Sequence, residues 1–123
     1  MPNDATDPRS LLPLKPIVFD ILVVLAVEEL HGWSLAKALR ERAGGGAPIL
    51  PGNLYRTLKA MLTQGLIEES GERPDPEEDD ERRRYYRVSD FGRAVARAEA
   101  RRLEEVLREA RNAALVPERP GGR

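Results

Sequence analysis

The segment Pro51–Ser70, PGNLYRTLKAMLTQGLIEES, constrains the fold more than any other part of the chain. Large apolar side chains recur in it at helical spacing and form one stripe, made by Leu54, Leu58, Met61 and Leu62. Pro51 can begin such a helix, because a first turn leaves that amide position unpaired in any case. Gly65 can end the helix in a left-handed cap. The pattern predicts a two-faced helix, then a stop, then a strand.

The face opposite the stripe is short, polar and positively charged, and it carries Arg56, Lys59, Ala60 and Thr63. A buried stripe backed by such a face suits a helix that lies in the major groove of DNA. An ordinary amphipathic core helix shows the same pattern, so the segment alone leaves both interpretations open.

Length and composition limit the class of protein. A chain of 123 residues makes about one domain. The absence of cysteine excludes disulfides and thiolate chemistry, and a single histidine, His31, makes no zinc site. The longest apolar run, Ile17–Val27, contains Asp20 and is shorter than the roughly 20 residues that span a bilayer. We therefore expect a soluble, cytoplasmic protein with no cofactor, no metal and no membrane partner.

The net charge of −1 conceals an uneven distribution. Residues 67–81 carry a net −8, and the remainder of the chain carries +7. Binding to a polyanion depends on the field near the contact and not on the total charge. The overall balance is therefore compatible with a nucleic-acid partner.

Two helices are predicted before Pro51. The first, from Lys15 to about Glu29, is apolar nearly all round, which is typical of a helix buried on most sides or in an interface. Residues 30–33 are expected to form a turn with Trp33 in the core. Ser34 is then the expected N-cap of a second helix, residues 35–43. Followed by the helix at Pro51, this order predicts a helix-turn-helix.

After Gly65 the sequence predicts a wing and a long last helix. Leu66–Ser70 and Arg83–Ser89 are expected to pair as antiparallel strands around a long acidic loop. Ser89 can cap a helix that runs to about Ala114. Its small and apolar residues follow a heptad seam that predicts a dimer interface: Ala96, Ala100, Leu103, Leu107 and Ala110. Val95 and Val106 widen this seam, and Arg and Glu occupy the other faces.

The predicted class is thus mainly helical with a small antiparallel β-hairpin, arranged as a winged helix-turn-helix. We expect a flexible N-terminus over residues 1–12 and a DNA-binding domain over residues 13–89. A C-terminal dimerisation helix over residues 90–115 and a flexible tail over residues 116–123 complete the chain.

Three motifs in this order resemble the PadR family of bacterial transcriptional regulators, in its short-tailed branch with a single C-terminal helix. They are LHGWSLAKAL from Leu30, PGNLYRTLKAMLTQGLIE from Pro51 and RRYYRVSDFGR from Arg83. The resemblance implies a repressor that acts as a homodimer through its last helix, with small apolar or aromatic effectors in some members. Two positions depart from the family pattern: Trp33 replaces the usual tyrosine, and Leu50 replaces a serine that often caps the following helix.

The resemblance implies that Tyr55, Arg56 and the neighbouring helix face meet DNA. The expected DNA-binding residues are Asn53, Tyr55, Arg56, Lys59, Lys37, Arg83 and Arg84. Alternatives remain open for several of them. Asn53 can instead serve a turn or cap, Tyr55 can pack in the core, and Arg83 and Arg84 can neutralise the acidic loop before them.

An effector pocket is expected in the dimer crevice between the first and last helices, around Phe19 and Val23, and Trp33 is a further candidate wall. No arrangement of residues suggests catalysis, so we expect no enzyme activity. The leading hypothesis is a DNA-binding transcriptional regulator. The alternative, favoured by the acidic loop, is a winged-helix module that binds proteins without DNA.

Overall fold

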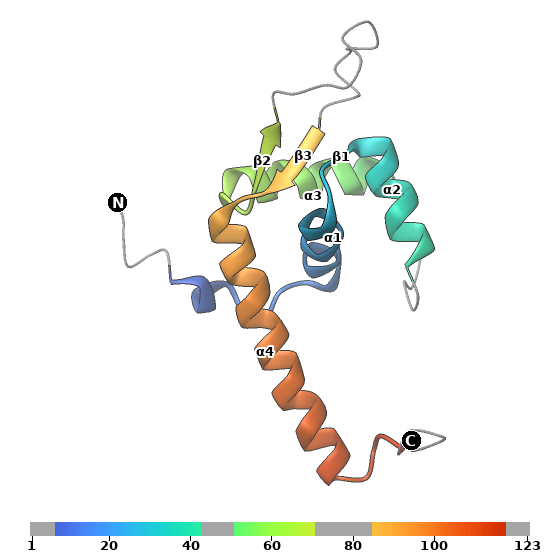
Figure 1. Cartoon of the computed structure of the whole chain (residues 1–123), viewed down its shortest axis with the longest axis vertical. Coiled ribbons are helices and arrows are strands. Elements are labelled where there is room, and N and C mark those ends of the chain that lie inside the picture. The colour runs from blue at the N-terminus through green and yellow to red at the C-terminus, as the bar shows by residue number, and fades with distance from the viewer. Residues whose placement is uncertain (1–6, 43–50, 71–84, 118–123) are drawn as a thin grey trace, which may run out of the picture.

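The computed structural model describes residues 7–42, 51–70 and 85–117. Its helical elements are the 3-10 turn η2 (Pro8–Leu11), α1 (Pro16–Val27), α2 (Gly32–Glu41), α3 (Pro51–Thr63) and α4 (Asp90–Asn112). Its strands are β1 (Leu30–His31), β2 (Ile67–Ser70) and β3 (Tyr85–Val88). Figure 1 shows the helix-turn-helix and the small sheet at one end of the long helix α4. The predicted class, mainly helical with a small antiparallel sheet in a winged helix-turn-helix, is confirmed.

The sheet contains one strand that the sequence did not predict. Its order is β1-β3-β2, and both pairings are antiparallel. The predicted hairpin of β2 and β3 is present, but residues 30 and 31, expected to form a turn, pair with Tyr86 and Tyr85 as β1. A strand of two residues shows no alternating pattern in sequence. It forms because β3 offers a second edge, which the chain between α1 and α2 reaches.

The start of α2 differs from the prediction. His31, and not Ser34, is the N-cap, and its Nδ1 accepts a hydrogen bond of 3.3 Å from the Ser34 amide. The Ser34 hydroxyl lies 3.0 Å from Nε2 of the same ring. Because the helix begins at Gly32, Trp33 falls on its outer side, where 53% of its surface is exposed. The prediction that Trp33 is a core residue is therefore wrong. The predicted end at Ala43 lies outside the described residues.

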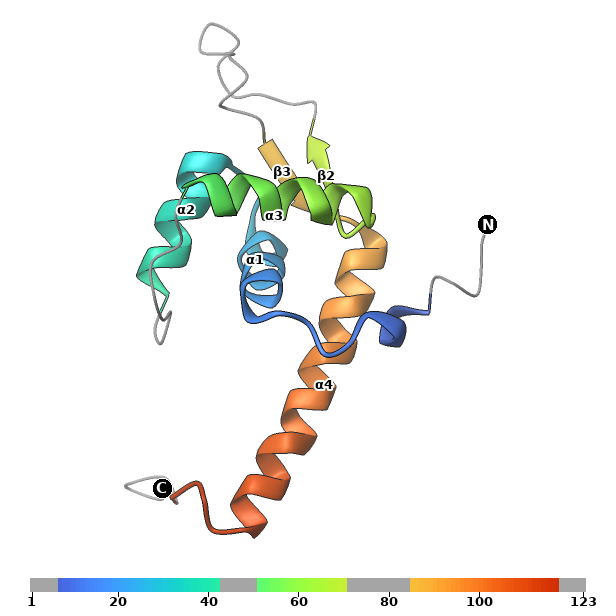
Figure 2. The ribbon, with the colours of Figure 1, turned by 180° about the vertical axis from the view of Figure 1, so that it is seen from behind.

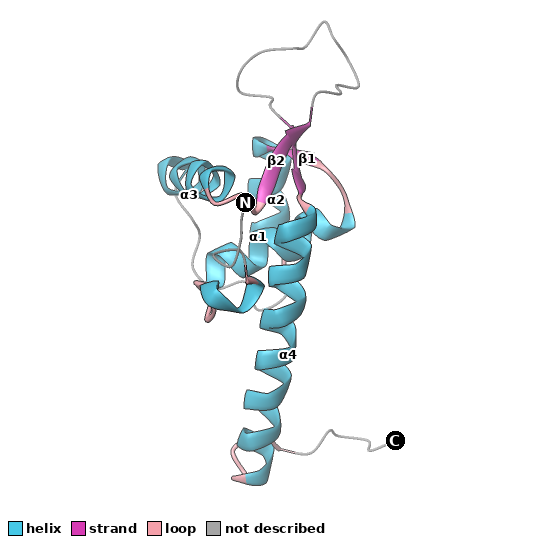
Figure 3. Ribbon diagram, turned by 90° about the vertical axis from the view of Figure 1, so that its left-hand side faces the viewer, coloured by secondary structure: helices cyan, strands magenta, loops and turns pink. Residues whose placement is uncertain are grey.

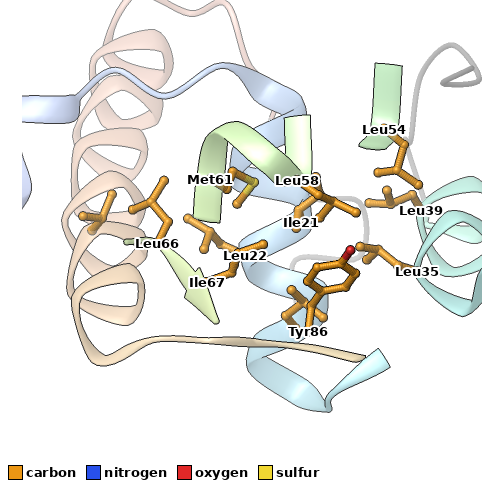
Figure 4. Packing of buried hydrophobic residues seen from close by; sticks show 12 residues of the cluster. Ile21, Leu22, Leu35, Leu39, Leu54, Leu58, Met61, Leu66, Ile67 and Tyr86 are labelled. Carbon is orange, nitrogen blue, oxygen red and sulfur yellow. The ribbon is translucent and has the colours of Figure 1, made fainter. Parts of the chain in front are cut away.

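The core forms where α1 meets the other helices and the sheet (Figure 4). Its buried members are Ile21, Leu22 and Leu25 of α1, Leu35 and Leu39 of α2, Leu54, Leu58 and Met61 of α3, and Leu66, Ile67, Tyr86 and Val95. The apolar stripe of the helix at Pro51 thus packs as predicted. Val95 is fully buried in this core, so its predicted place in the dimer seam is wrong. The first turns of α4 still pack against the domain, and Val95 lies in them.

The junction between the wing and α4 is close. Gly65 has φ +78°, the left-handed conformation predicted for the end of α3. Ser89 caps α4 as predicted: its Oγ accepts from the Gly92 amide at 2.9 Å and donates to the Gly65 carbonyl. A Cβ at Gly92 would overlap the carbonyl oxygen of Leu66. Glycine is therefore required where α4 crosses the start of β2.

The segment Asp7–Lys15, here called the N-terminal arm, overlaps the range 1–12 for which the sequence predicted a flexible N-terminus. Its η2 turn is closed by Asp7, whose side chain accepts from the Arg9 amide at 2.9 Å, and it packs against α4. Figure 2 shows the arm running from the start of α1 across α4. The contact joins residues more than eighty positions apart, which a pattern read along the chain does not reveal.

Candidate nucleic-acid interface

The outer face of α3 is exposed and carries no acidic residue. Figure 3 shows α3 at the outer edge of the molecule, on the opposite side of the domain from the sheet and α4. Asn53, Arg56 and Lys59 are exposed on this helix, while Leu54 and Leu58 of its inner face are 1% exposed. The same helix is thus held by the core and presents cations outward. This division is what a helix in a DNA groove requires.

Arg56 and Asn53 contact each other across one turn of α3. Nη1 of Arg56 donates a hydrogen bond of 2.9 Å to Oδ1 of Asn53. The other Arg56 nitrogens have no partner among the described residues. A guanidinium held at one nitrogen keeps donors in a fixed fork for a guanine edge or a phosphate. Asn53 thus orients the arginine, a role beyond the capping alternative that the sequence left open.

Tyr55 joins the two helices of the helix-turn-helix. It is 38% exposed, so it belongs to the border between core and surface. A Cβ built at Gly32 would lie 2.5 Å from the Tyr55 hydroxyl oxygen, which places the ring over the first turn of α2. Gly32 is therefore a positioning residue that our sequence reasoning missed. Its position beside the motif tyrosine in space could not be seen in the sequence.

The remaining predicted cations divide into two groups. Lys37 of α2 and Lys59 of α3 are exposed, as a phosphate contact requires. Arg83 and Arg84 lie outside the described residues. Arg87 on β3 is described, and its Nε donates to Oε1 of Glu68 at 3.1 Å across the hairpin. Both side chains are about half exposed, so this pair contributes little to stability.

The seam predicted on α4 is largely uncovered. Ala100, Leu103 and Leu107 are exposed, whereas Ala96 and Ala110 are half-buried, with Ala96 against the core. Val106 is also exposed, at 45%. The second half of α4 projects beyond the rest of the domain (Figures 1 and 3). An apolar row on a projecting helix is typical of a surface that another chain covers.

Glu99, on a face of the same helix outside the seam, is buried. Its side chain is 3% exposed and accepts from Nε and Nη2 of Arg102 at 2.7 and 3.0 Å. Oε2 also accepts from the Leu14 amide at 3.2 Å. The Arg102 hydrogen bonds hold the pKa of Glu99 below its ordinary value, against the effect of burial, and the Leu14 amide adds to them. Glu99 therefore fastens the N-terminal arm to α4.

Two cavities adjoin the N-terminal arm. One, of about 440 Å³, lies between the arm, the start of α1 and the side of α3 that carries Arg56 and Ala60. The other, of about 590 Å³, lies between the arm and α4. The effector candidates Phe19 and Val23 are half-buried and Trp33 is exposed, and none of the three lines either cavity.

Neither a metal-ligand cluster nor a membrane-spanning helix is found among the described residues. No three His, Asp or Glu side chains gather there as a metal site would need. None of the helices in those ranges combines the length and the apolar run that a membrane crossing requires.

The fold and the cationic outer helix define a winged helix-turn-helix of the nucleic-acid-binding class. Residues 21–98 match the model of the transcriptional regulator PadR-like family, more than half of the chain. The chain therefore belongs to the PadR-like family of transcriptional regulators, as its motifs suggested. It is a DNA-binding transcriptional regulator and not an enzyme. Among curated proteins, none matches the sequence.

Solved structures share this architecture at low sequence identity. A PadR-like transcriptional regulator from Bacillus cereus has a TM-score of 0.66 and 21% identity, over 82% of this chain and 93% of that one. The hsRosR-S4 complex has a TM-score of 0.60 and 24% identity, over 88% of this chain and 99% of that one. Bacillus subtilis PadR, solved with operator DNA, has a TM-score of 0.57 and 20% identity, over 70% of this chain and 47% of that one. These similarities show the winged-helix fold.

Proposed function

We propose that this regulator is a repressor that binds a near-palindromic operator as a homodimer. The observation that carries the proposal is the exposed, acid-free face of α3, whose opposite side is core. Bacillus subtilis PadR, which has the same fold, was solved on operator DNA. In a two-fold dimer, two copies of α3 enter successive major grooves about 34 Å apart.

We expect some of the DNA contacts to read base identity and the others to position the protein on the phosphate backbone. Arg56, oriented by Asn53, bonds a base edge or a phosphate, and Asn53 lies near the helix start, where recognition helices meet bases. Tyr55, Lys59 and Lys37 bond phosphates. Arg83 and Arg84 of the wing follow the backbone or enter the minor groove, unless the acidic residues before them take their charge.

The dimer forms through α4. Its exposed apolar residues belong to the predicted heptad seam, and two such seams pack against each other as in a coiled coil. Association would cover Leu103, Val106 and Leu107. We expect a small aromatic or apolar effector in the dimer crevice between α1 and α4 near Phe19 and Val23, with Trp33 as a candidate wall, although these three residues line neither cavity described above. Its binding would alter the dimer geometry and lower DNA affinity.

The experiment is a fluorescence-anisotropy titration of operator DNA at several salt concentrations, after the operator has been selected from genomic fragments. Arg56→Ala should weaken specific binding by about 1–3 kcal/mol if the arginine reads a base. Lys59→Ala should weaken all sequences alike and lower the slope of log K against log salt by about one. Arg108→Ala, at the far end of α4, removes the same charge and should change neither quantity.

Two results would reject this function. Affinity that does not depend on salt, or an Arg56→Ala variant that binds like the wild type, would remove α3 from the interface. Stable capture of a protein partner without DNA retention at low salt would favour the alternative, a winged-helix module that binds proteins without DNA. The net negative charge of residues 67–81 is the feature that favours this alternative. The sign of regulation is tested separately, since loss of a repressor raises transcription from its operator.

A further inference from the structure

Arg56 lies at the centre of the outer face of α3, and its neighbours along the helix axis are small. The residues one turn before and one turn after it are Gly52 and Ala60, and Thr63 lies two turns after it; all of them are exposed. A Cβ added at Gly52 would meet no atom within 4 Å. The backbone of α3 can therefore come close to the floor of a groove, with Arg56 extending from the middle of the approaching face.

The hydrogen bond to Asn53 leaves one edge of the Arg56 guanidinium complete. Nη1 donates to Oδ1 of Asn53 at 2.9 Å, while Nε and Nη2 have no partner among the described residues. One N–H of Nε and one of Nη2 point the same way in the plane of the guanidinium. Together they form a two-donor edge, which fits two acceptors that lie side by side.

This two-donor edge matches guanine better than any other base. The major-groove edge of guanine presents two adjacent acceptors, N7 and O6. Adenine presents N7 beside the N6 amino group, so one arginine donor would face another donor, and a pyrimidine presents at most one acceptor. An arginine held by a fixed partner also keeps fewer rotamers with which it could bond a phosphate instead, and this favours base reading.

The same hydrogen bond restricts what Asn53 can read. A bidentate contact of asparagine with adenine needs Oδ1 to accept from N6 while Nδ2 donates to N7. Oδ1 of Asn53 accepts from Arg56, so a contact with adenine would compete with that bond. Asn53 is exposed in the first turn of α3, the end at which recognition helices meet base edges. This geometry suits Asn53 to a positioning role that it exerts through Arg56.

We propose that Arg56 reads one guanine in each operator half-site through its Nε–Nη2 edge, and that Asn53 sets the strength of this preference by holding Nη1. The inference rests on the proposed function, because it specifies what α3 recognises once the helix lies in the major groove. Contact of Arg56 with a phosphate, the alternative left open above, would give affinity without a preference for any base.

The guanine is tested by anisotropy titrations of the full-length protein on the selected operator, at salt low enough for weak variants to bind. Each G·C pair of one half-site is replaced in turn by A·T, or its guanine by 7-deazaguanine, which keeps base pairing and O6 but lacks N7. At one position, adenine should weaken wild-type binding about five- to 150-fold, the range of one bidentate base contact. The 7-deazaguanine at that position should weaken it by a smaller factor.

Arg56→Ala assigns this position to the arginine. The variant should bind the guanine and adenine operators alike at that base pair and keep the wild-type preferences at all others. If every replacement affects the wild type and Arg56→Ala by the same factor, Arg56 reads no guanine and the proposal is overturned.

Asn53→Ala and Asn53→Asp test the positioning role, and the quantity compared is the ratio of the affinities for the guanine and adenine operators. Alanine removes the acceptor for Nη1 and should lower this ratio about two- to tenfold, the range for one immobilised side chain. Aspartate keeps an acceptor for Arg56 and should restore the ratio, although its charge lowers both affinities. Lys59→Ala, one turn along the same face, is the matched control and should lower both affinities without changing their ratio.

Three results would reject the role of Asn53: an unchanged ratio in Asn53→Ala, a ratio lost equally in Asn53→Ala and Asn53→Asp, or a preference lost at a base pair other than that of Arg56. The last result would mean that Asn53 itself reads a base. Salt-dependent binding with no guanine preference rejects this inference and leaves the proposed function intact. Failure to bind any duplex at low salt rejects the proposed function and the inference with it.

Discussion

The buried carboxylate of Glu99 yields the sharpest prediction about stability. Its partner Arg102 is 38% exposed and supplies two hydrogen bonds, while the Leu14 amide supplies the third. Arg102→Ala leaves a buried charge with a single donor. Removing one partner of a buried pair costs about 3–5 kcal/mol. Solvent around Arg102 screens the pair, so we expect a loss of about 2–3 kcal/mol in the free energy of unfolding.

Glu99→Gln has a smaller effect, and its sign depends on Arg102. Glutamine keeps the shape and an acceptor for the Leu14 amide but loses the charge-assisted bonds, so the wild type should lose about 1–2 kcal/mol. In the Arg102→Ala background the same change removes an uncompensated buried charge and should restore about 1 kcal/mol. The double-mutant cycle should therefore show a coupling of more than 1 kcal/mol.

The effect of Glu99 depends on pH in a defined direction. Its hydrogen bonds with Arg102, and then the Leu14 amide, hold the pKa below the ordinary 4.5. A carboxyl with a lowered folded pKa contributes stability above its unfolded pKa and loses it as pH falls through the folded pKa. The difference between wild type and Glu99→Gln should thus be full at pH 7 and shrink below about pH 4.5.

Urea unfolding followed by circular dichroism measures these differences, at one fixed protein concentration so that any association contributes equally. The m-value should stay constant across the variants. Equal destabilisation by Glu99→Gln with and without Arg102, or a difference from wild type that does not change with pH, would refute the reasoning. Either result would mean that the carboxylate is not buried against Arg102.

Two further predictions use simpler variants. Gly92→Ala should cost about 2 kcal/mol or more, because its Cβ would overlap the Leu66 carbonyl; Gly52→Ala, with nothing within 4 Å of the added carbon, should be neutral or stabilising by up to about 1 kcal/mol. Similar losses at both glycines would contradict the close crossing of α4 and β2. Leu103→Glu and Leu107→Glu should convert the proposed dimer to monomers in sedimentation equilibrium, and an unchanged mass would reject the seam on α4.

Several local elements could be predicted because their signals lie within a few residues of one another. The apolar stripe of α3 repeats at three and four positions, and the glycine that ends this helix directly follows it. The Ser89 cap and the Gly92 amide that it binds are three residues apart. Such patterns depend on backbone geometry alone, so they can be recognised in a single sequence.

Two predictions from the sequence were wrong: the N-cap of α2 and the place of Val95 in the seam of α4. The sequence placed the cap of α2 on Ser34, although a histidine can also accept an amide hydrogen bond when its ring is in the correct tautomer. That error moved the start of the helix and put Trp33 in the core. Val95 fits the heptad pattern, but the helix packs against its own domain before it projects.

The sequence alone predicted the order of the helices, the two-faced helix α3 and the membership of a regulator family. These could be predicted because periodicity and motifs are local. Several features arise only when distant segments meet: the strand β1, the burial of Glu99, the close contact of Tyr55 with Gly32, and the cavity between the N-terminal arm and α3. Leu14 and Glu99 are 85 positions apart, and nothing in either residue's neighbourhood indicates the other. Long-range packing, and not local propensity, therefore determines how the N-terminal arm, α4 and α3 are joined.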